Sequence, residues 1–245
     1  MKDHEFEFLS CDEQLIQSER LAAIGQMING LAHTSRNAIQ RARSCVDLLE
    51  LDLHEQPELL GLTVRIRMAL SDLLRNYEDV QKYATPIVLH LQLVDSVALL
   101  ERAFQELRNT FPNYRHRLIL HGSTSESFIQ GDEIRLLQVF RNILRNSMEA
   151  SNPHSEIAIQ LQSKEINSKG FQEIVIRDTG VGMDDSTLAQ IFDPFFTTKQ
   201  SGSGLGLAVC KRIVESHSGK IYATTKRGNG TTVTLLFPIQ IRESR

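Results

Sequence analysis

The chain has 245 residues, of which 23% are charged and 41% hydrophobic, and its formal net charge is −3. This length suits one large or two modest domains, and the slightly acidic balance argues against nucleic-acid binding. No apolar run approaches the roughly 20 residues of a membrane span, and the start resembles no signal peptide, so we expect no membrane insertion. The three cysteines lack metal-type spacing, which favours a reduced, cytoplasmic protein.

The first third of the chain has the periodicity of two amphipathic helices. Apolar residues recur at three- and four-residue steps over about 12–53 and again after Pro57 to residue 84. This spacing predicts an antiparallel helical hairpin with a short turn. The expected seams are Leu21, Ile24, Ile28, Leu31, Ala38, Ala42, Cys45 and Leu49, then Leu59, Leu62, Ile66, Ala69, Leu73, Val80 and Tyr83. Because a hairpin buries only one side of each helix, we expect two copies to form a dimeric four-helix bundle.

Beyond Thr85–Pro86 the long helical periodicity ends. Short strand patterns mixed with helical ones follow, and they predict an α/β sandwich. Strands are predicted at 88–93, 117–121, 127–130, 156–162, 173–177, 220–226 and 231–238. Helices are predicted at 94–109, from an N-cap at Asp132 to about 150, and at 204–216. The expected fold is therefore multidomain, α plus α/β. Its predicted parts are an N-terminal segment 1–11, the hairpin 12–84, a hinge and first strand 85–93, the sandwich 94–240 and a tail 241–245.

Three polar or glycine-rich blocks of the second half describe a nucleotide pocket. Asn142 and Asn146 lie one helical turn apart, and an amide oxygen is a hard ligand suited to Mg²⁺. Asp178 ends an apolar strand, so that its carboxylate can accept from an exocyclic amine. The glycines Gly180 and Gly182 that follow allow close approach to a flat base.

The third block, Gly202–Gly206, runs directly into a helical pattern and can present backbone N–H groups to phosphates. Alone, the blocks also fit exposed asparagines, a strand-ending turn and a flexible linker. The sequence has no P-loop signature, and its glycine spacing is not that of a Rossmann fold.

The ordered blocks resemble the ATP-binding domain shared by sensor histidine kinases, gyrase, Hsp90 and MutL, over about residues 90–239. The resemblance implies that Asn146 holds Mg²⁺ and that Asp178 recognises adenine. It also implies a mobile lid over 183–203, in which Lys199 reaches phosphate. The phosphate loop comprises Gly202, Gly204, Leu205 and Gly206, and Gly228–Thr231 matches the family's last glycine box.

One position of this pattern separates the branches of the family. Hydrolytic members carry a glutamate four residues before the metal asparagine, where this chain has Asn142. An amide cannot act as a base toward water, so transfer of the phosphoryl group to another acceptor is favoured.

The segment around His33 resembles the phosphoacceptor helix of sensor histidine kinases, whose usual pattern is H-[ED]-x-x-[NT]-P. In the heptad frame His33 falls at the solvent-facing f position, and neutral imidazole is nucleophilic. Thr34 replaces the acidic residue expected to take or orient the imidazole proton, and Ala38 replaces the proline. Asn37 matches the position that, in the family, orients water against a partner's phospho-aspartate.

These features predict a cytoplasmic, homodimeric sensor histidine kinase core. ATP with Mg²⁺ phosphorylates His33, and the phosphoryl group passes to an aspartate in the receiver domain of a response regulator. Since only about a dozen residues precede the first helix, the signal is expected either to come from a separate sensory partner or to act directly on the bundle. The alternative is a phosphatase-biased or catalytically weak scaffold, which Thr34 favours. An ATPase switch of the Hsp90 or MutL type conflicts with Asn142, and a serine kinase of the anti-sigma type leaves the helical half unexplained.

Overall fold

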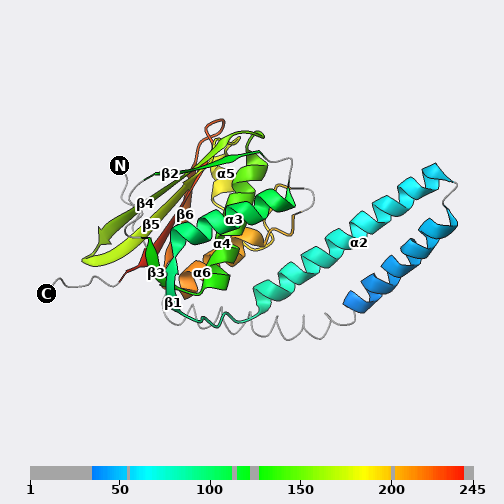
Figure 1. Ribbon diagram of the computed structural model, residues 1–245, viewed down its shortest axis with the longest axis horizontal. Coiled ribbons are helices and arrows are strands. Elements are labelled where there is room, and N and C mark those ends of the chain that lie inside the picture. The colour runs from blue at the N-terminus through cyan, green and yellow to red at the C-terminus, as the bar shows by residue number, and fades with distance from the viewer. Residues whose placement is uncertain (1–34, 54–55, 112–114, 122–126, 200–201, 240–245) are drawn as a thin grey trace. The chain divides into compact units, whose positions relative to one another are not determined.

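The computed structural model describes residues 35–53, 56–111, 115–121, 127–199 and 202–239. Residue contacts divide the chain into two units. One contains the chain up to Pro86 together with Thr198–Ser203, and the other contains Ile87–Thr197 and Gly204–Arg245. A helical region followed by an α/β domain was predicted, and this order is confirmed (Figure 1). The finer division, with a hinge over 85–93, stays a prediction.

The helical unit is an antiparallel hairpin of the helical residues 35–52 and α2 (Pro57–Ala84). Pro57 occupies the first turn of α2, where its missing N–H costs nothing. The helix ends at Ala84 because Thr85, which precedes a proline, is extended. Polar contacts join the two helices, since Glu50 accepts from the Thr63 hydroxyl at 3.1 Å and from Arg67 at 2.9 Å.

The predicted apolar seam is not the surface along which these two helices pack. Among the hairpin residues that the structure describes, the buried apolar side chains are Ile39 and Val46 on the first helix, and Ala84 at the end of α2. By contrast, four members of the predicted α2 seam are 39–54% exposed: Leu59, Leu62, Ile66 and Leu73. The hairpin therefore uses a neighbouring face for its own packing and leaves the strongest apolar stripe of α2 uncovered.

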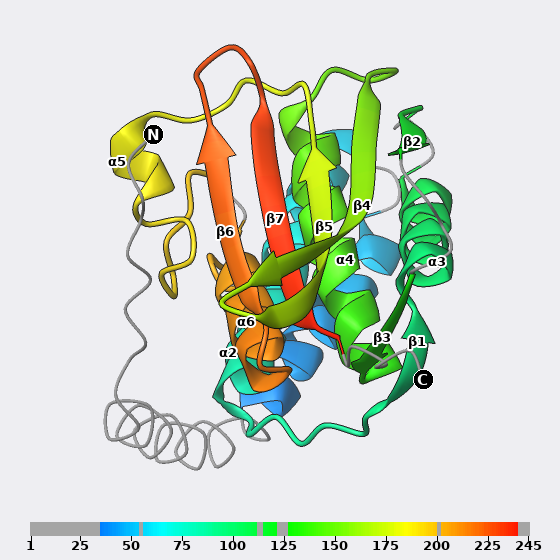
Figure 2. The same ribbon diagram turned by 90° about the vertical axis from the view of Figure 1, so that its left-hand side faces the viewer.

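The second unit contains a five-stranded sheet of order β2-β4-β5-β7-β6 and a two-stranded sheet of β1 and β3. The strands are β1 (Gln92–Asp95), β2 (Arg117–His121), β3 (Phe128–Gly131), β4 (Glu156–Ile166), β5 (Lys169–Arg177), β6 (Lys220–Thr225) and β7 (Thr231–Pro238). The helices are α3 (Ser96–Thr110), α4 (Glu133–Ala150), α5 (Asp185–Leu188) and α6 (Gly206–Ser216). Figure 2 shows α4 and α6 behind one face of the larger sheet.

The core of this unit lies between α4, α6 and the large sheet. Strand residues whose side chains alternate toward the helices, such as Ile159, Ile174 and Leu235, have no exposed surface. Phe140 and Leu144 of α4 are equally buried against them. Full burial of an aromatic or leucine side chain contributes roughly 1.5–3 kcal/mol, so this layer holds α4 and α6 against the sheet.

A buried polar contact ties the start of α4 to the end of α6. Asp132 is the N-cap of α4, as predicted, and its carboxylate accepts from the amides of Arg135 and His90. Burial opposes its ionisation, but these amides hold the pKa of Asp132 below its ordinary value. The Asp132 amide in turn donates to Nε2 of His217 at 2.9 Å. Because Nδ1 of His217 lies 2.7 Å from the Ile213 carbonyl, the imidazole is neutral with its proton on Nδ1.

Three predicted boundaries of this unit were wrong. The first strand was predicted at 88–93 but pairs only over Gln92–Asp95, because β3 offers four partner residues. Strands β4 and β5 extend well beyond the predicted 156–162 and 173–177, meeting in a tight turn at Asn167 and Ser168, both at positive φ. The short helix α5 was not predicted.

Candidate nucleotide site

Asp178 lies at the end of β5 in a fixed orientation. Its side chain is 3% exposed, and its Oδ1 accepts from the backbone N–H groups of Gly180 at 2.9 Å and Thr231 at 3.0 Å. The Asp178 amide donates to the Thr231 carbonyl at 2.9 Å. Among the described residues, both hydrogen bonds to the Asp178 carboxylate are accepted by Oδ1. Oδ2 can therefore accept a hydrogen bond from a ligand's amine.

Backbone contacts hold the loop after Asp178 against the hairpin of β6 and β7. The Gly228 amide donates to the Val181 carbonyl at 2.7 Å, and the Met183 amide donates to the Thr225 hydroxyl at 3.0 Å. Gly182 has φ +63°, and a Cβ there would overlap the Lys226 carbonyl oxygen. The glycine is therefore required for the close approach of the two backbones.

Thr225 and Ala150 belong to this arrangement, although sequence reasoning missed both. The Thr225 hydroxyl also donates to the Gly230 carbonyl at 2.9 Å and lies 3.2 Å from the hydroxyl of Thr231. The Ala150 carbonyl, at the end of α4, accepts from the Val181 amide at 3.2 Å. A threonine on a strand and an alanine on a helix are common, so only the folded chain identifies them.

Asn142 and Asn146 lie on one face of α4, both half-buried, as their four-residue spacing predicts. The Asn142 side-chain amide donates to the Gly206 carbonyl at 3.1 Å. This contact joins α4 to the first residue of α6, so Asn142 helps to position the loop that leads into α6. Asn146 lies one turn further along α4, toward the Asp178 loop.

The N-terminus of α6 is suited to an anion. Leu205 precedes the helix, is fully buried, and accepts from the Val209 amide at 2.8 Å. No side chain of the described residues caps this helix, so the first-turn amides from Gly206 onward remain for a ligand. Gly204 has φ +69°, and a Cβ there would overlap the backbone of Phe195.

The remaining predicted residues do not enter this geometry. His33 and Thr34 lie outside the described residues. Asn37 is half-buried on the first helix of the hairpin. By their residue contacts, Lys199 and Gly202 belong to the helical unit. Their roles at the nucleotide stay predictions.

The donor set of the site fits a metal that is held largely through a nucleotide. No cluster of three His, Cys, Asp or Glu side chains that could hold a metal exists within the described ranges. Asn146 offers a neutral amide oxygen, and Mg²⁺ is commonly bound by one or two protein oxygens together with waters and substrate phosphates. The residues present are therefore compatible with Mg²⁺ only when phosphates complete its coordination.

Comparison with known proteins defines the class. Residues 131–241 match the model of the family of histidine kinase-, DNA gyrase B- and HSP90-like ATPases, so this part of the chain is similar to that family. Over 226 residues the chain is 33% identical to the signal transduction histidine-protein kinase AtoS of Escherichia coli (strain K12). That similarity covers 92% of this chain and 36% of AtoS. The chain is thus related to the sensor histidine kinases of two-component systems, as the sequence motifs predicted.

Solved structures agree with this relationship. A mycobacterial sensor histidine kinase, MprB, is 25% identical with a TM-score of 0.51, over 61% of this chain and 97% of that chain. Full-length ShkA, whose crystal structure contains AMPPNP, has a TM-score of 0.67 over 87% of this chain and 45% of that chain. At 22% identity, ShkA supports the fold alone.

The described ranges also bear on membrane insertion. None of the helices they contain combines the length and the apolar composition that a membrane span requires.

Proposed function

We propose that this chain is a protein-histidine kinase that transfers the γ-phosphoryl group of ATP to His33. The observation that carries the proposal is the orientation of Asp178, whose Oδ1 is held by the amides of Gly180 and Thr231 while Oδ2 remains available. A carboxylate fixed in this way selects a base with an exocyclic amine, as adenine has. The phosphates would then extend toward the uncapped N-terminus of α6.

Within the proposed site the chain's own residues mainly position the nucleotide and neutralise the charge of its phosphates. Asn146 would hold Mg²⁺, which supplies positive charge to the phosphates when bound. Lys199 and the amides from Gly204 to Gly206 would stabilise the charge that develops on the transferred group. Asn142, which donates to the Gly206 carbonyl, keeps the loop in place and contributes no base for water. Transfer to a side chain is therefore favoured over hydrolysis.

In this proposal the acceptor is the imidazole of His33, followed by an aspartate in the receiver domain of a response regulator. Neutral imidazole attacks the γ-phosphorus while the bond to the β-γ bridging oxygen breaks, and ADP leaves. The neutral hydroxyl of Thr34 is not a base at physiological pH and cannot take the imidazole proton as a carboxylate would, so we expect autophosphorylation to be slow.

We also propose that the hairpin forms a homodimer. The support is the uncovered stripe of α2, where Leu62, Ile66 and Leu73 are 48–54% exposed in one chain. Contiguous apolar surface of this kind commonly marks an interface, and a second hairpin with the same stripe is its natural complement. Two hairpins would then form a four-helix bundle.

The test is incubation of the chain with γ-labelled ATP and Mg²⁺, compared with His33→Gln. An acid-labile, base-stable label that is absent from the variant would support the proposal. The variant Asp178→Asn provides a second comparison, because it should lose the label through loss of ATP binding. Nucleotide binding without label on the unmodified chain would contradict the kinase proposal.

A second candidate function is removal of phosphate from a response regulator. Thr34 favours it because the missing carboxylate affects autophosphorylation, whereas Asn37, which would orient the attacking water, is present. The test is the decay of a phosphorylated regulator with the native chain and with Asn37→Ala. Faster decay that depends on Asn37 but not on His33 would favour this function.

A further inference from the structure

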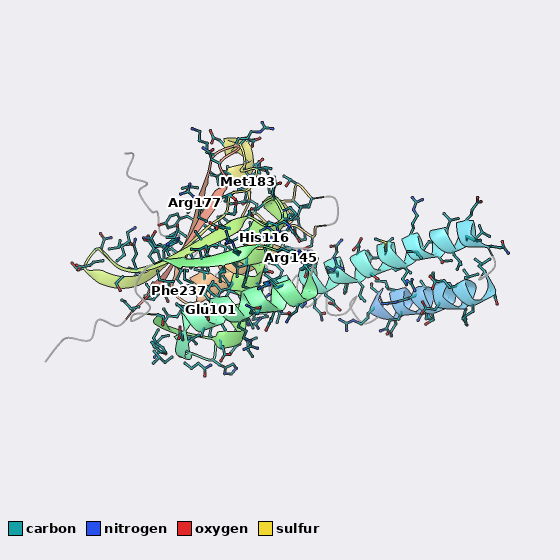
Figure 3. All side chains as sticks on the ribbon, turned by 45° about the horizontal axis from the view of Figure 1, so that its top comes forward. Glu101, His116, Arg145, Arg177, Met183 and Phe237 are labelled. Carbon is teal, nitrogen blue, oxygen red and sulfur yellow. The ribbon has the colours of Figure 1, made fainter. Side chains whose placement is uncertain are left out.

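A groove of about 1130 Å³ lies between α3 and β2. One wall is the exposed face of α3, and the other is β2 with the residues just before it. Figure 3 labels one residue of each wall, Glu101 on α3 and His116 before β2. The arginines of the lining are Arg102, Arg108, Arg115 and Arg117. None of these residues takes part in the nucleotide site.

The β2 wall is the open edge of the large sheet. β2 stands at the end of the strand order, and its partner among the described strands is β4, in parallel register. An edge strand presents unpaired N–H and C=O groups, which another extended chain can pair with. Leu118, Ile119 and Leu120 are half-buried and line the groove, so its floor is apolar.

The rim of the groove is positively charged. Glu101 is the single acidic residue of its lining, against four arginines, in a chain whose net charge is −3. Arg117 pairs with Glu156 at 2.6 Å, and Arg102 pairs with Glu106 and Glu133. Arg108 and Arg115 are exposed and take part in none of the ion pairs formed among the described residues.

We propose that this groove binds an extended, acidic segment of a partner protein, which adds to β2 as a further strand. The open edge of β2 can form backbone hydrogen bonds with an extended segment but not with a helix, whose backbone groups are already paired. In such a segment alternate side chains face the same side. Carboxylates at alternate positions would meet Arg108 and Arg115, while the apolar residues between them cover Leu118 and Leu120.

The experiment uses the full chain and a fluorescent peptide of about nine residues that alternates glutamate with valine. Fluorescence anisotropy should report binding that weakens as salt is added. The variant with both Arg108→Glu and Arg115→Glu should bind at least about tenfold more weakly. Arg75→Glu, an exposed arginine on α2, is the matched control and should bind as the native chain does.

Two further peptides make the test specific. A peptide that alternates lysine with valine should not bind, and N-methylation of alternate backbone amides should weaken the acidic peptide by about tenfold, because it removes strand donors. Equal binding of the lysine peptide, or no effect of N-methylation or of the double substitution, would overturn the proposal. Loss of self-association in the double variant would assign the groove to a second copy instead. No nucleotide is present, so these outcomes are independent of kinase activity.

Discussion

The amide of Thr231 donates to Oδ1 of Asp178 at 3.0 Å, although the two residues are 53 positions apart in the sequence. A second pair of backbone atoms joins the same residues, since the Asp178 amide donates to the Thr231 carbonyl at 2.9 Å. The first residue of β7 therefore orients the carboxylate at the end of β5. Any change that moves one of these strands moves the proposed adenine contact with it.

Replacing Asp178 with asparagine should weaken ATP binding by at least about tenfold. The amide group keeps one oxygen but replaces an acceptor with a donor, so either the ligand's amine or the amides of Gly180 and Thr231 lose a partner. Isothermal titration calorimetry with ATP and Mg²⁺ measures the effect. Asp72→Asn on α2 is the control, and equal affinities for the two variants would contradict the proposed role of Asp178.

Replacing Gly230 with alanine should destabilise the second unit more than replacing Gly228. Both glycines have φ near +80°, so each alanine costs about 1–2 kcal/mol of left-handed strain. At Gly230, however, the new Cβ would overlap the carbonyl oxygen of Asp178, whereas at Gly228 no heavy atom lies within 4 Å. Urea unfolding of the two variants measures the difference. Equal losses of unfolding free energy for the two variants would show that the backbone at Gly230 can move away from Asp178 at little energetic cost.

Local signals predicted several parts of this structure well. Asp132 was predicted as an N-cap, and its side chain does accept from the Arg135 amide. The second helical pattern was predicted to start at about Pro57, and α2 begins at that residue. In both positions the decisive interaction lies within a few residues along the chain. The spacing of Asn142 and Asn146 likewise placed both amides on one face of α4.

Interactions between distant segments could not be predicted in the same way. The contact of Asn142 with the Gly206 carbonyl joins residues 64 positions apart, and no sequence pattern in either segment predicts it. The lengths of β4 and β5 depend on their mutual pairing, which continues to Ile166 and Lys169. Periodicity found the apolar stripe of α2 but not which face packs within the chain, since Ile39 and Val46 lie beside the predicted seam rather than on it.

Acidification should destabilise the second unit through His217. Burial lowers the pKa of His217 against the opposing effects of the Ile213 carbonyl and of Asp132, so the folded state keeps the imidazole neutral. As pH falls through about 6.5, the unfolded chain binds this proton first, and stability falls with it. The stabilising effect of the neutral form is therefore complete above that pH.

Thermal unfolding between about pH 7.5 and 5.5 measures this dependence. His217→Gln should be less stable at neutral pH, because the fit between α4 and α6 is disturbed, but its midpoint should change less on acidification. The exposed His121→Gln is the matched control and should keep the slope of the native chain. A His217→Gln slope equal to the native one would assign the pH dependence to other groups.

Replacing Ile66 with aspartate should convert the proposed dimer into a monomer. Ile66 is 48% exposed on the apolar stripe of α2, so in one chain the new carboxylate is already in water and the hairpin should keep its helicity. In a four-helix bundle the same carboxylate would be buried without a partner, which costs several kcal/mol. Multi-angle light scattering measures the mass. Val64→Asp is the matched control, because Val64 is 41% exposed but two residues away from the seam, and it should leave the dimer intact. Dimers of both variants, or monomers of both, would contradict the assignment of this stripe to the interface.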